Sequence, residues 1–220
     1  QEGYDDFELV LKNSNNPLTV EEFKYSMNLK DVIVLDVRNQ NDFRQGFIPG
    51  SIFIGLKGSF APWVGSIIKD INTKLLLVCD KGFEEEAILR LSRVGFDNCL
   101  GYLDGGINSW TTDYDLDVIE SISADDLSEI IEKVNLIDVR KSGERSNGYL
   151  LNSKHISLDD FQEKINEIDN AKSNYIHCAG GYRSMIACSI LKRNGYDSVI
   201  DVKGGFSSIR NSNFKIINNV

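Results

Sequence analysis

Histidine, proline and methionine are scarce in this chain of 220 residues, which has two histidines, three prolines and two methionines. With only His155 and His177 available, a histidine-rich metal site cannot be assembled, and no metal or other cofactor is expected. Basic residues are also outnumbered, with 24 Lys and Arg against 33 Asp and Glu, for a formal net charge of −9. This balance argues against a nucleic-acid-binding protein, whose binding face would be basic.

Long hydrophobic runs are missing as well. No stretch approaches the ~18 apolar residues of a membrane-spanning helix, and no basic-plus-apolar start suggests secretion. Four cysteines, Cys79, Cys99, Cys178 and Cys188, are too few for a disulfide framework in a chain of this length. We therefore expect reduced thiols in a cytoplasmic protein without membrane or nucleic-acid partners. Because the chain starts at Gln1 rather than at Met, we expect a fragment of a longer polypeptide.

An internal repeat organises what is present. Four segments recur in the same order at offsets of 102, 99, 100 and 99 residues, which predicts two copies of one domain. The pairs are Val34–Arg38 with Leu136–Arg140, Leu76–Cys79 with Tyr175–Cys178, Arg93–Asn98 with Arg193–Ser198, and Asp104–Gly106 with Lys203–Gly205.

Both copies show the same order of predicted elements: a capped helix, an apolar strand, a variable loop, a strand ending in cysteine, a second helix, and a last strand leading into Gly-Gly. Apolar strands that alternate with helices indicate an α/β fold with a mostly parallel sheet covered on both faces. We expect the first domain at 18–112 and the second at 119–216. The stretch 1–17 is expected to be an N-terminal linker or fragment edge, and a linker is expected near 111–119.

The first helices of the two copies are expected at Thr19–Met27 and Ser123–Glu132. Thr19 and Ser123 are the candidate N-caps. Glu22 completes a capping box with Thr19, and Asp126 makes a shorter version with Ser123.

Cys178 lies at the point where a predicted strand meets a glycine-bearing turn and the start of a helix. Successive backbone N–H groups in such a turn form an anion-binding nest, and the helix start adds partial positive charge. Arg183 contributes a permanent cation. All three favour the thiolate form, so Cys178 is a candidate nucleophile rather than a structural cysteine. The hypothesis requires a sulfur atom that solvent and substrate can reach.

The corresponding loop of the first copy, Cys79–Glu85, has the opposite charge. Glu84 stands where the second copy has Arg183. An anion at that point disfavours a thiolate and repels an anionic substrate. We therefore expect a degenerate, catalytically weak or silent site, in which Cys79 is a small buried residue at the end of a strand.

Together these motifs resemble the rhodanese-like family. The matching pieces are the Asp-Val-Arg strand ends, the segment Phe43–Ser51, the cysteine loop and the closing Gly-Gly turn. The combination of Glu84–Asp97 with a later Cys-Ala-Gly-Gly-Tyr-Arg-Ser run is similar to the tandem rhodanese region at the C-terminus of fusions with a metallo-β-lactamase fold, the persulfide dioxygenase type. The resemblance implies two five-stranded domains, the second active, and a partner domain of metallo-β-lactamase fold that is absent from this chain.

The resemblance also implies a sulfurtransferase cycle. The thiolate of Cys178 would attack the outer sulfur of thiosulfate or a low-molecular-weight persulfide, and a thiol or cyanide would then take the sulfur from the Cys178 persulfide. Arg183 would hold the negative group of the substrate, and Asp138 with Arg140 would have a structural or supporting role. The remaining loop residues would cradle the persulfide: Ala179, Gly180, Gly181, Tyr182 and Ser184.

Two alternatives stay open. A cysteine phosphatase would use a similar loop, but four residues separate Cys178 from Arg183, whereas phosphatase loops have five between the two. A non-catalytic interaction module within a larger persulfide-metabolising enzyme is the other. The charge of the cysteine loop distinguishes a catalytic domain from an interaction module. It is positive in the second copy and negative in the first.

Overall fold

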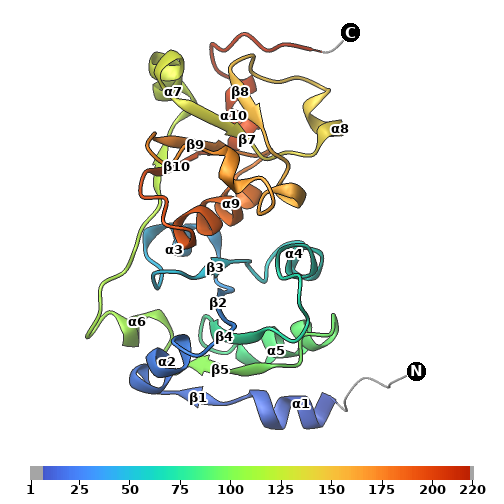
Figure 1. The fold of residues 1–220 in the computed structure, drawn as a ribbon, viewed down its shortest axis with the longest axis vertical. Coiled ribbons are helices and arrows are strands. Elements are labelled where there is room, and N and C mark those ends of the chain that lie inside the picture. The colour runs from blue at the N-terminus through green and yellow to red at the C-terminus, as the bar shows by residue number, and fades with distance from the viewer. Residues whose placement is uncertain (1–6, 219–220) are drawn as a thin grey trace. The chain divides into compact units, whose positions relative to one another are not determined.

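The computed structural model describes residues 7–218 of the chain, which divides into two compact domains between Val118 and Ile119 (Figure 1). Each domain contains one parallel five-stranded sheet with helices on both faces. The α/β fold expected from the sequence is therefore confirmed. No helix within residues 7–218 is both long and apolar enough to cross a membrane.

The first sheet has the strand order β1-β5-β4-β2-β3, and every neighbouring pair is parallel. Its strands are β1 (Pro17–Leu18), β2 (Val32–Asp36), β3 (Ile52–Phe53), β4 (Lys74–Val78) and β5 (Cys99–Leu103). The helices of this domain are α1 (Phe7–Ser14), α2 (Val20–Met27), α3 (Gln40–Gln45), α4 (Phe60–Ile67), α5 (Glu84–Ser92) and α6 (Ile107–Trp110).

The second sheet repeats this topology in the order β6-β10-β9-β7-β8. Its strands are β6 (Glu120–Ile122), β7 (Asn135–Asp138), β8 (Ser153–His155), β9 (Asn174–His177) and β10 (Val199–Val202). The helices are α7 (Ala124–Ile130), α8 (Ser142–Arg145), α9 (Tyr182–Arg193) and α10 (Gly205–Arg210), with short 3₁₀ turns η1 (Ile131–Lys133), η2 (Leu158–Asp160) and η3 (Ile165–Glu167).

Local sequence signals set the helix that opens each of the two repeats. Thr19 caps α2, and its reciprocal bonds with Glu22 complete the expected capping box. Ser123 caps α7 and accepts a hydrogen bond from the Asp126 amide. The α-helical part of this second helix ends at Ile130, and the expected last turn continues as the 3₁₀ turn η1.

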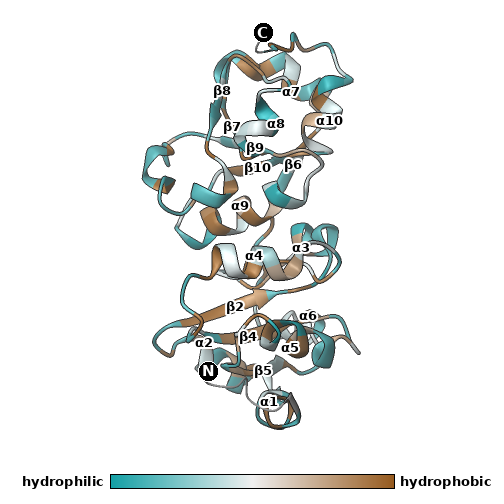
Figure 2. Cartoon of the chain, turned by 90° about the vertical axis from the view of Figure 1, so that its right-hand side faces the viewer, coloured by the Kyte–Doolittle hydropathy of each residue, from teal (hydrophilic) through white to brown (hydrophobic). Residues whose placement is uncertain are grey.

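Both faces of each sheet are covered, so the side chains on both faces are apolar. The strand sequences are therefore nearly continuous hydrophobic runs. Figure 2 shows β2 as a hydrophobic, brown strand inside the first domain. In the second domain, one face of the sheet packs under α7 and α10 through Leu127, Leu136, Val202 and Phe206. The other face packs against α9, which contacts both β9 and β10. The last residues of β9 and the first turn of α9 are thereby held against each other.

The stretch 1–17, expected to be a linker, contains a packed helix. Helix α1 contacts α5, and Val10 and Ser14 are buried. Pro17 and Leu18 then form the edge strand β1. Tertiary contacts with α5 and β5 make these residues part of the domain.

Candidate active site

The loop between β9 and α9 places the sulfur of Cys178 at a helix N-terminus. Gly181, with φ of 108°, turns the chain in the left-handed region that favours glycine, and α9 starts at the next residue. The Gly181 amide donates a hydrogen bond to Cys178 Sγ at 3.1 Å. Of the backbone amides expected to surround the sulfur, that of Gly181 is therefore directed at it.

Cys178 is buried, with 1 % of its surface exposed. This differs from the expectation of a thiol open to solvent. The loop residues Gly181 and Ser184 are buried beside it, whereas Gly180 is exposed. Cys178 lies at the floor of its loop because the C-terminal end of the central strand β9 is enclosed between layers. A donor molecule can reach the sulfur only if some of the atoms that cover it move.

Ser184, in the first turn of α9, lies on the inner side of the sulfur. Its Oγ is 3.6 Å from Cys178 Sγ, 2.9 Å from the Gly181 carbonyl oxygen and 2.6 Å from Asp201 Oδ1. Asp201 comes from β10 and is 6 % exposed. Sequence reasoning missed Asp201, although a lone acidic residue inside an apolar strand is a signal that could have found it.

Arg183 is bound to Glu144 of α8 rather than to the sulfur. Its two terminal nitrogens lie 2.5 and 2.6 Å from the two carboxylate oxygens of Glu144. This hydrogen bonding lowers the pKa of Glu144 and raises that of Arg183. Arg183 also interacts electrostatically with Cys178, so its charge still acts on the site. Sequence reasoning missed Glu144, whose sequence distance from the loop hides the contact.

The Gly-Gly turn holds the cysteine loop from the other side. The Phe206 amide donates to the Cys178 carbonyl oxygen at 2.7 Å, and the Ser207 amide donates to the Ala179 carbonyl oxygen at 3.1 Å. A Cβ atom at Gly205 would lie 2.5 Å from the Cys178 carbonyl oxygen. Glycine at this position is therefore required for α10 to reach the loop.

Beneath the loop, Asp138 and Arg140 form a buried ion pair. Arg140 Nη2 is 2.7 Å from Asp138 Oδ2 and also donates to the Gly148 carbonyl oxygen at 2.9 Å. Arg145 Nη1 makes a second ion pair with Asp138 Oδ2, at 2.9 Å. Burial opposes ionisation, but the bonds and charge of Arg140, with the nearby His177, hold the pKa of Asp138 at about 2. The pair anchors the chain between β7 and Gly148.

The two histidines of the chain contact the residues that support the cysteine loop. His177 is fully buried and stacks on Phe206, and burial lowers its pKa to about 4. Its Nε2 atom is 3.9 Å from Asp138 Oδ2. His155 Nε2 lies 2.7 Å from the Arg140 carbonyl oxygen. Neither side chain is hydrogen-bonded to the sulfur in these contacts.

In the first domain, Glu84 takes the amide donor that the second domain directs at its cysteine. The Gly82 amide, equivalent to that of Gly181, donates to Glu84 Oε2 at 2.7 Å. Burial, followed by the charge of Glu84, raises the pKa of Cys79 well above its ordinary value. The charge effect argued from the sequence is present, but burial is the larger cause. Cys79 is therefore held as a neutral thiol.

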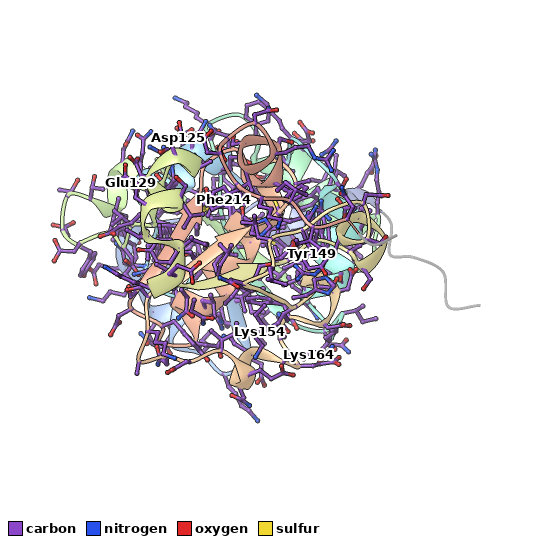
Figure 3. All side chains as sticks on the ribbon, turned by 90° about the horizontal axis from the view of Figure 1, so that it is seen from above. Asp125, Glu129, Tyr149, Lys154, Lys164 and Phe214 are labelled. Carbon is purple, nitrogen blue, oxygen red and sulfur yellow. The ribbon has the colours of Figure 1, made fainter. Side chains whose placement is uncertain are left out.

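The domains also differ beside their buried ion pairs. In the first domain Arg38 pairs with Asp36 at 2.6 Å, and Phe43 stacks on Phe47 with ring centroids 4.2 Å apart. In the second domain Arg145 stands at the position of Phe43, and its guanidinium carbon lies 4.4 Å above the ring of Tyr149. Figure 3 labels Tyr149 together with Phe214, which packs against the domain core. An aromatic pair is thus replaced by a cation on an aromatic ring.

All four cysteines are free and buried. Cys188 lies within α9, and burial raises its pKa well above the ordinary value. Burial likewise raises the pKa of Cys99, to about 12. Residues 7–218 contain no group of three or more His, Cys, Asp or Glu side chains arranged to hold a metal ion.

Comparison with protein families settles the origin of the repeat. The model of the rhodanese-like domain matches residues 19–113 and 123–212. The chain belongs to the rhodanese-like family. Both of its domains are rhodanese-like, and its function is accordingly of the sulfurtransferase type.

Individual rhodanese-like relatives match the length of one domain. The thiosulfate sulfurtransferase GlpE of Shewanella oneidensis is 30 % identical over 94 residues, 42 % of this chain and 89 % of the relative. A sulfurtransferase of Allochromatium vinosum is 28 % identical over 91 residues, 40 % of this chain and 85 % of the relative. A rhodanese-related crystal structure from Thermoplasma volcanium has 31 % identity and a TM-score of 0.43, covering 46 % of this chain and 99 % of its own.

Proposed function

We propose that the second domain transfers sulfane sulfur from thiosulfate or a low-molecular-weight persulfide to a thiol or cyanide, through a persulfide on Cys178. The observation that carries the proposal is the hydrogen bond from the Gly181 amide to Cys178 Sγ at the N-terminus of α9. Such a donor stabilises negative charge on the sulfur, both in the attacking thiolate and in the persulfide that follows.

The other loop residues take supporting roles in this proposal. Arg183 holds the negative group of the donor, which requires it to exchange its bonds with Glu144 for bonds with the substrate. The cradle of the persulfide is formed by Ala179, Gly180, Gly181, Tyr182 and Ser184. Asp138 and Arg140 keep the chain beneath the loop in place.

The first domain is proposed to be silent and to serve as an interaction module. The Glu84 carboxylate accepts the hydrogen bond of the Gly82 amide, which leaves this amide without a role at Cys79. A metallo-β-lactamase-fold domain is the proposed partner, on the strength of the sequence resemblance. The small-molecule partners are the sulfur donor and the thiol acceptor.

The burial of Cys178 favours a second candidate, in which both domains are non-catalytic modules of a larger persulfide-metabolising enzyme. The experiment that separates the two is intact mass spectrometry after incubation with thiosulfate or glutathione persulfide. The proposed function requires a gain of one sulfur, its loss on addition of thiol, and peptide mapping of the gain to Cys178.

Matched variants sharpen this test. Cys178→Ser is expected to abolish the gain of sulfur while the fold is kept, and Cys79→Ser to leave it unchanged. Arg183→Glu should reproduce the defect of the first domain. A wild-type protein that takes up no sulfur, or a Cys178→Ser variant that still does, contradicts the proposal.

A further inference from the structure

Two buried side chains, Ser184 and Asp201, form consecutive contacts that begin at the sulfur of Cys178. Cys178 Sγ is 3.6 Å from Ser184 Oγ, and Ser184 Oγ is 2.6 Å from Asp201 Oδ1. Ser184 is fully buried and Asp201 is 6 % exposed.

The geometry fixes the direction of the hydrogen bonds. A serine hydroxyl has one hydrogen and two acceptor lone pairs. The short contact to a carboxylate is the strongest available to that hydrogen, stronger than the 2.9 Å contact to the Gly181 carbonyl oxygen. The hydrogen therefore faces Asp201, and the oxygen of Ser184 accepts from the S–H group of Cys178.

We propose that Ser184 and Asp201 form a proton relay that takes the thiol proton of Cys178 when the persulfide forms. The inference rests on the proposed function. The S–H bond breaks as an O–H bond forms at Ser184, and the original hydroxyl hydrogen of Ser184 passes to Asp201 Oδ1. Cys178 Sγ then bonds to the outer sulfur of the donor, and the remainder of the donor leaves with the electron pair of the broken bond, as sulfite in the case of thiosulfate.

The relay moves charge without creating it. Before the transfer one negative charge lies on Asp201; afterwards it lies on the sulfur, and no proton has left the buried site. Forming a thiolate by loss of the proton to water would instead leave two neighbouring buried anions, which repel each other and are poorly solvated. The relay therefore lowers the cost of ionising a sulfur that solvent does not reach.

The groups around the relay draw the charge toward the sulfur. The Gly181 amide and the N-terminus of α9 face Cys178, and Arg183 interacts with it electrostatically. Further along α9, Cys188 interacts with both Asp201 and Cys178, and Lys192 interacts with Cys188. On the neighbouring strand β6, Ser121 pairs with Asp201 through the backbone register. Ser184 touches the reacting sulfur, and Asp201 is a positioning residue and proton store that acts through it.

The test measures single-turnover persulfide formation by intact mass over a range of pH. The wild-type rate is expected to be flat through neutral pH, because the base is internal. In Asp201→Asn the rate at neutral pH should fall by about 100-fold or more and rise with pH, since hydroxide must replace the internal base. Asp197→Asn, which removes an exposed carboxylate of the same domain, should match the wild type.

Serine variants test the middle of the relay. Ser184→Ala is expected to show the same loss and the same pH dependence, and Ser184→Thr, which keeps a hydroxyl, to recover most of the rate. The double variant Asp201→Asn with Ser184→Ala should be no slower than either single variant, because the two residues act as one unit. Thermal unfolding of each variant separates these effects from loss of the fold, and the comparison of Ser184→Ala with Ser184→Thr carries the test if Asp201→Asn does not fold.

The outcomes distinguish the relay from the proposed function. If the wild type gains no sulfur, the proposed function fails. If the wild type gains sulfur and Asp201→Asn does so as fast or faster at neutral pH, the relay is wrong and Asp201 only repels the thiolate. The rate of alkylation of Cys178 by iodoacetamide against pH gives a second readout that needs no sulfur donor, and it should show the same loss in Asp201→Asn and Ser184→Ala.

Discussion

Arg183 and Glu144 are joined by both terminal nitrogens of the guanidinium and both oxygens of the carboxylate. The pair links the first turn of α9 to α8, so the cation of the cysteine loop is occupied before any substrate arrives. An anionic donor must compete with Glu144, whose side chain is 39 % exposed and can swing into solvent. The strength of the ion pair with Glu144 thus affects how tightly Arg183 can bind an anionic donor.

Glu144→Gln is expected to increase the second-order rate of persulfide formation with thiosulfate by about 2–5-fold. A partly exposed ion pair contributes up to ~1 kcal/mol, and its removal frees Arg183 for the donor. The rate is measured by stopped-flow or quenched mass spectrometry. Glu86→Gln, which breaks the pair of Glu86 with Arg90 in the other domain, is the control. A lower rate in Glu144→Gln would show that the pair instead holds the loop in its working form.

His177→Val, which copies Val78 of the first domain, is expected to flatten the pH dependence of stability of the second domain between pH 6.5 and about 4. Burial lowers the pKa of His177 from 6.5 to about 4, so the unfolded chain binds the proton more readily than the folded one. The contribution of the neutral His177 to the free energy of unfolding is therefore fully present above pH 6.5. It is lost as the pH falls toward 4, and the total loss is about 3 kcal/mol.

Urea unfolding at a series of pH values measures this slope. At still lower pH, Asp138 contributes a further loss of stability as the pH falls below its ordinary pKa of 3.8 toward about 2, and Glu144 and Asp169, whose pKa values are also lowered, add to it. This loss should become smaller in His177→Val, because His177 is one of the groups that lower the pKa of Asp138. A variant with the wild-type slope between pH 6.5 and 4 would assign the titration to another group.

Gly205→Ala is expected to disrupt the cysteine loop. The new Cβ would lie 2.5 Å from the Cys178 carbonyl oxygen, at a residue whose φ of 57° already disfavours a side chain. We expect a loss of about 1–3 kcal/mol in the free energy of unfolding and a loss of sulfur uptake. Gly143→Ala, where a Cβ meets nothing within 4 Å, is the control and should be neutral or slightly stabilising in α8. Equal stability of the two variants would refute the close approach.

Glu84→Gln in the first domain is expected to lower the pKa of Cys79 only in part. Burial is the largest cause of the raised pKa, and the charge of Glu84 comes second. The variant should therefore still take up no sulfur. The pH dependence of Cys79 alkylation, in a Cys178→Ser background, measures the shift. Sulfur uptake at Cys79 after this single change would show that charge alone silences the first domain.

The sequence predicted the fold in detail where local signals and periodicity agree. The recurrence of Asp-Val-Arg and Gly-Gly at a nearly constant offset is explained by two sheets of identical strand order. The caps Thr19 and Ser123 and the strand Cys99–Leu103 were predictable because neighbouring residues alone decide them. The packing of α1 could not be predicted in this way, because it depends on contacts with α5, which lies far along the chain.

The sequence by itself determined the duplication, the two parallel sheets, and the placement of Cys178 at a strand end before a glycine turn and a helix, since each follows from short-range pattern. Tertiary structure alone decided that Arg183 bonds with Glu144, that Asp201 lies behind Ser184, and that the sulfur of Cys178 is enclosed. These contacts join side chains from different elements, and only the packing of α8, α9 and β10 around one sheet brings them within hydrogen-bonding distance.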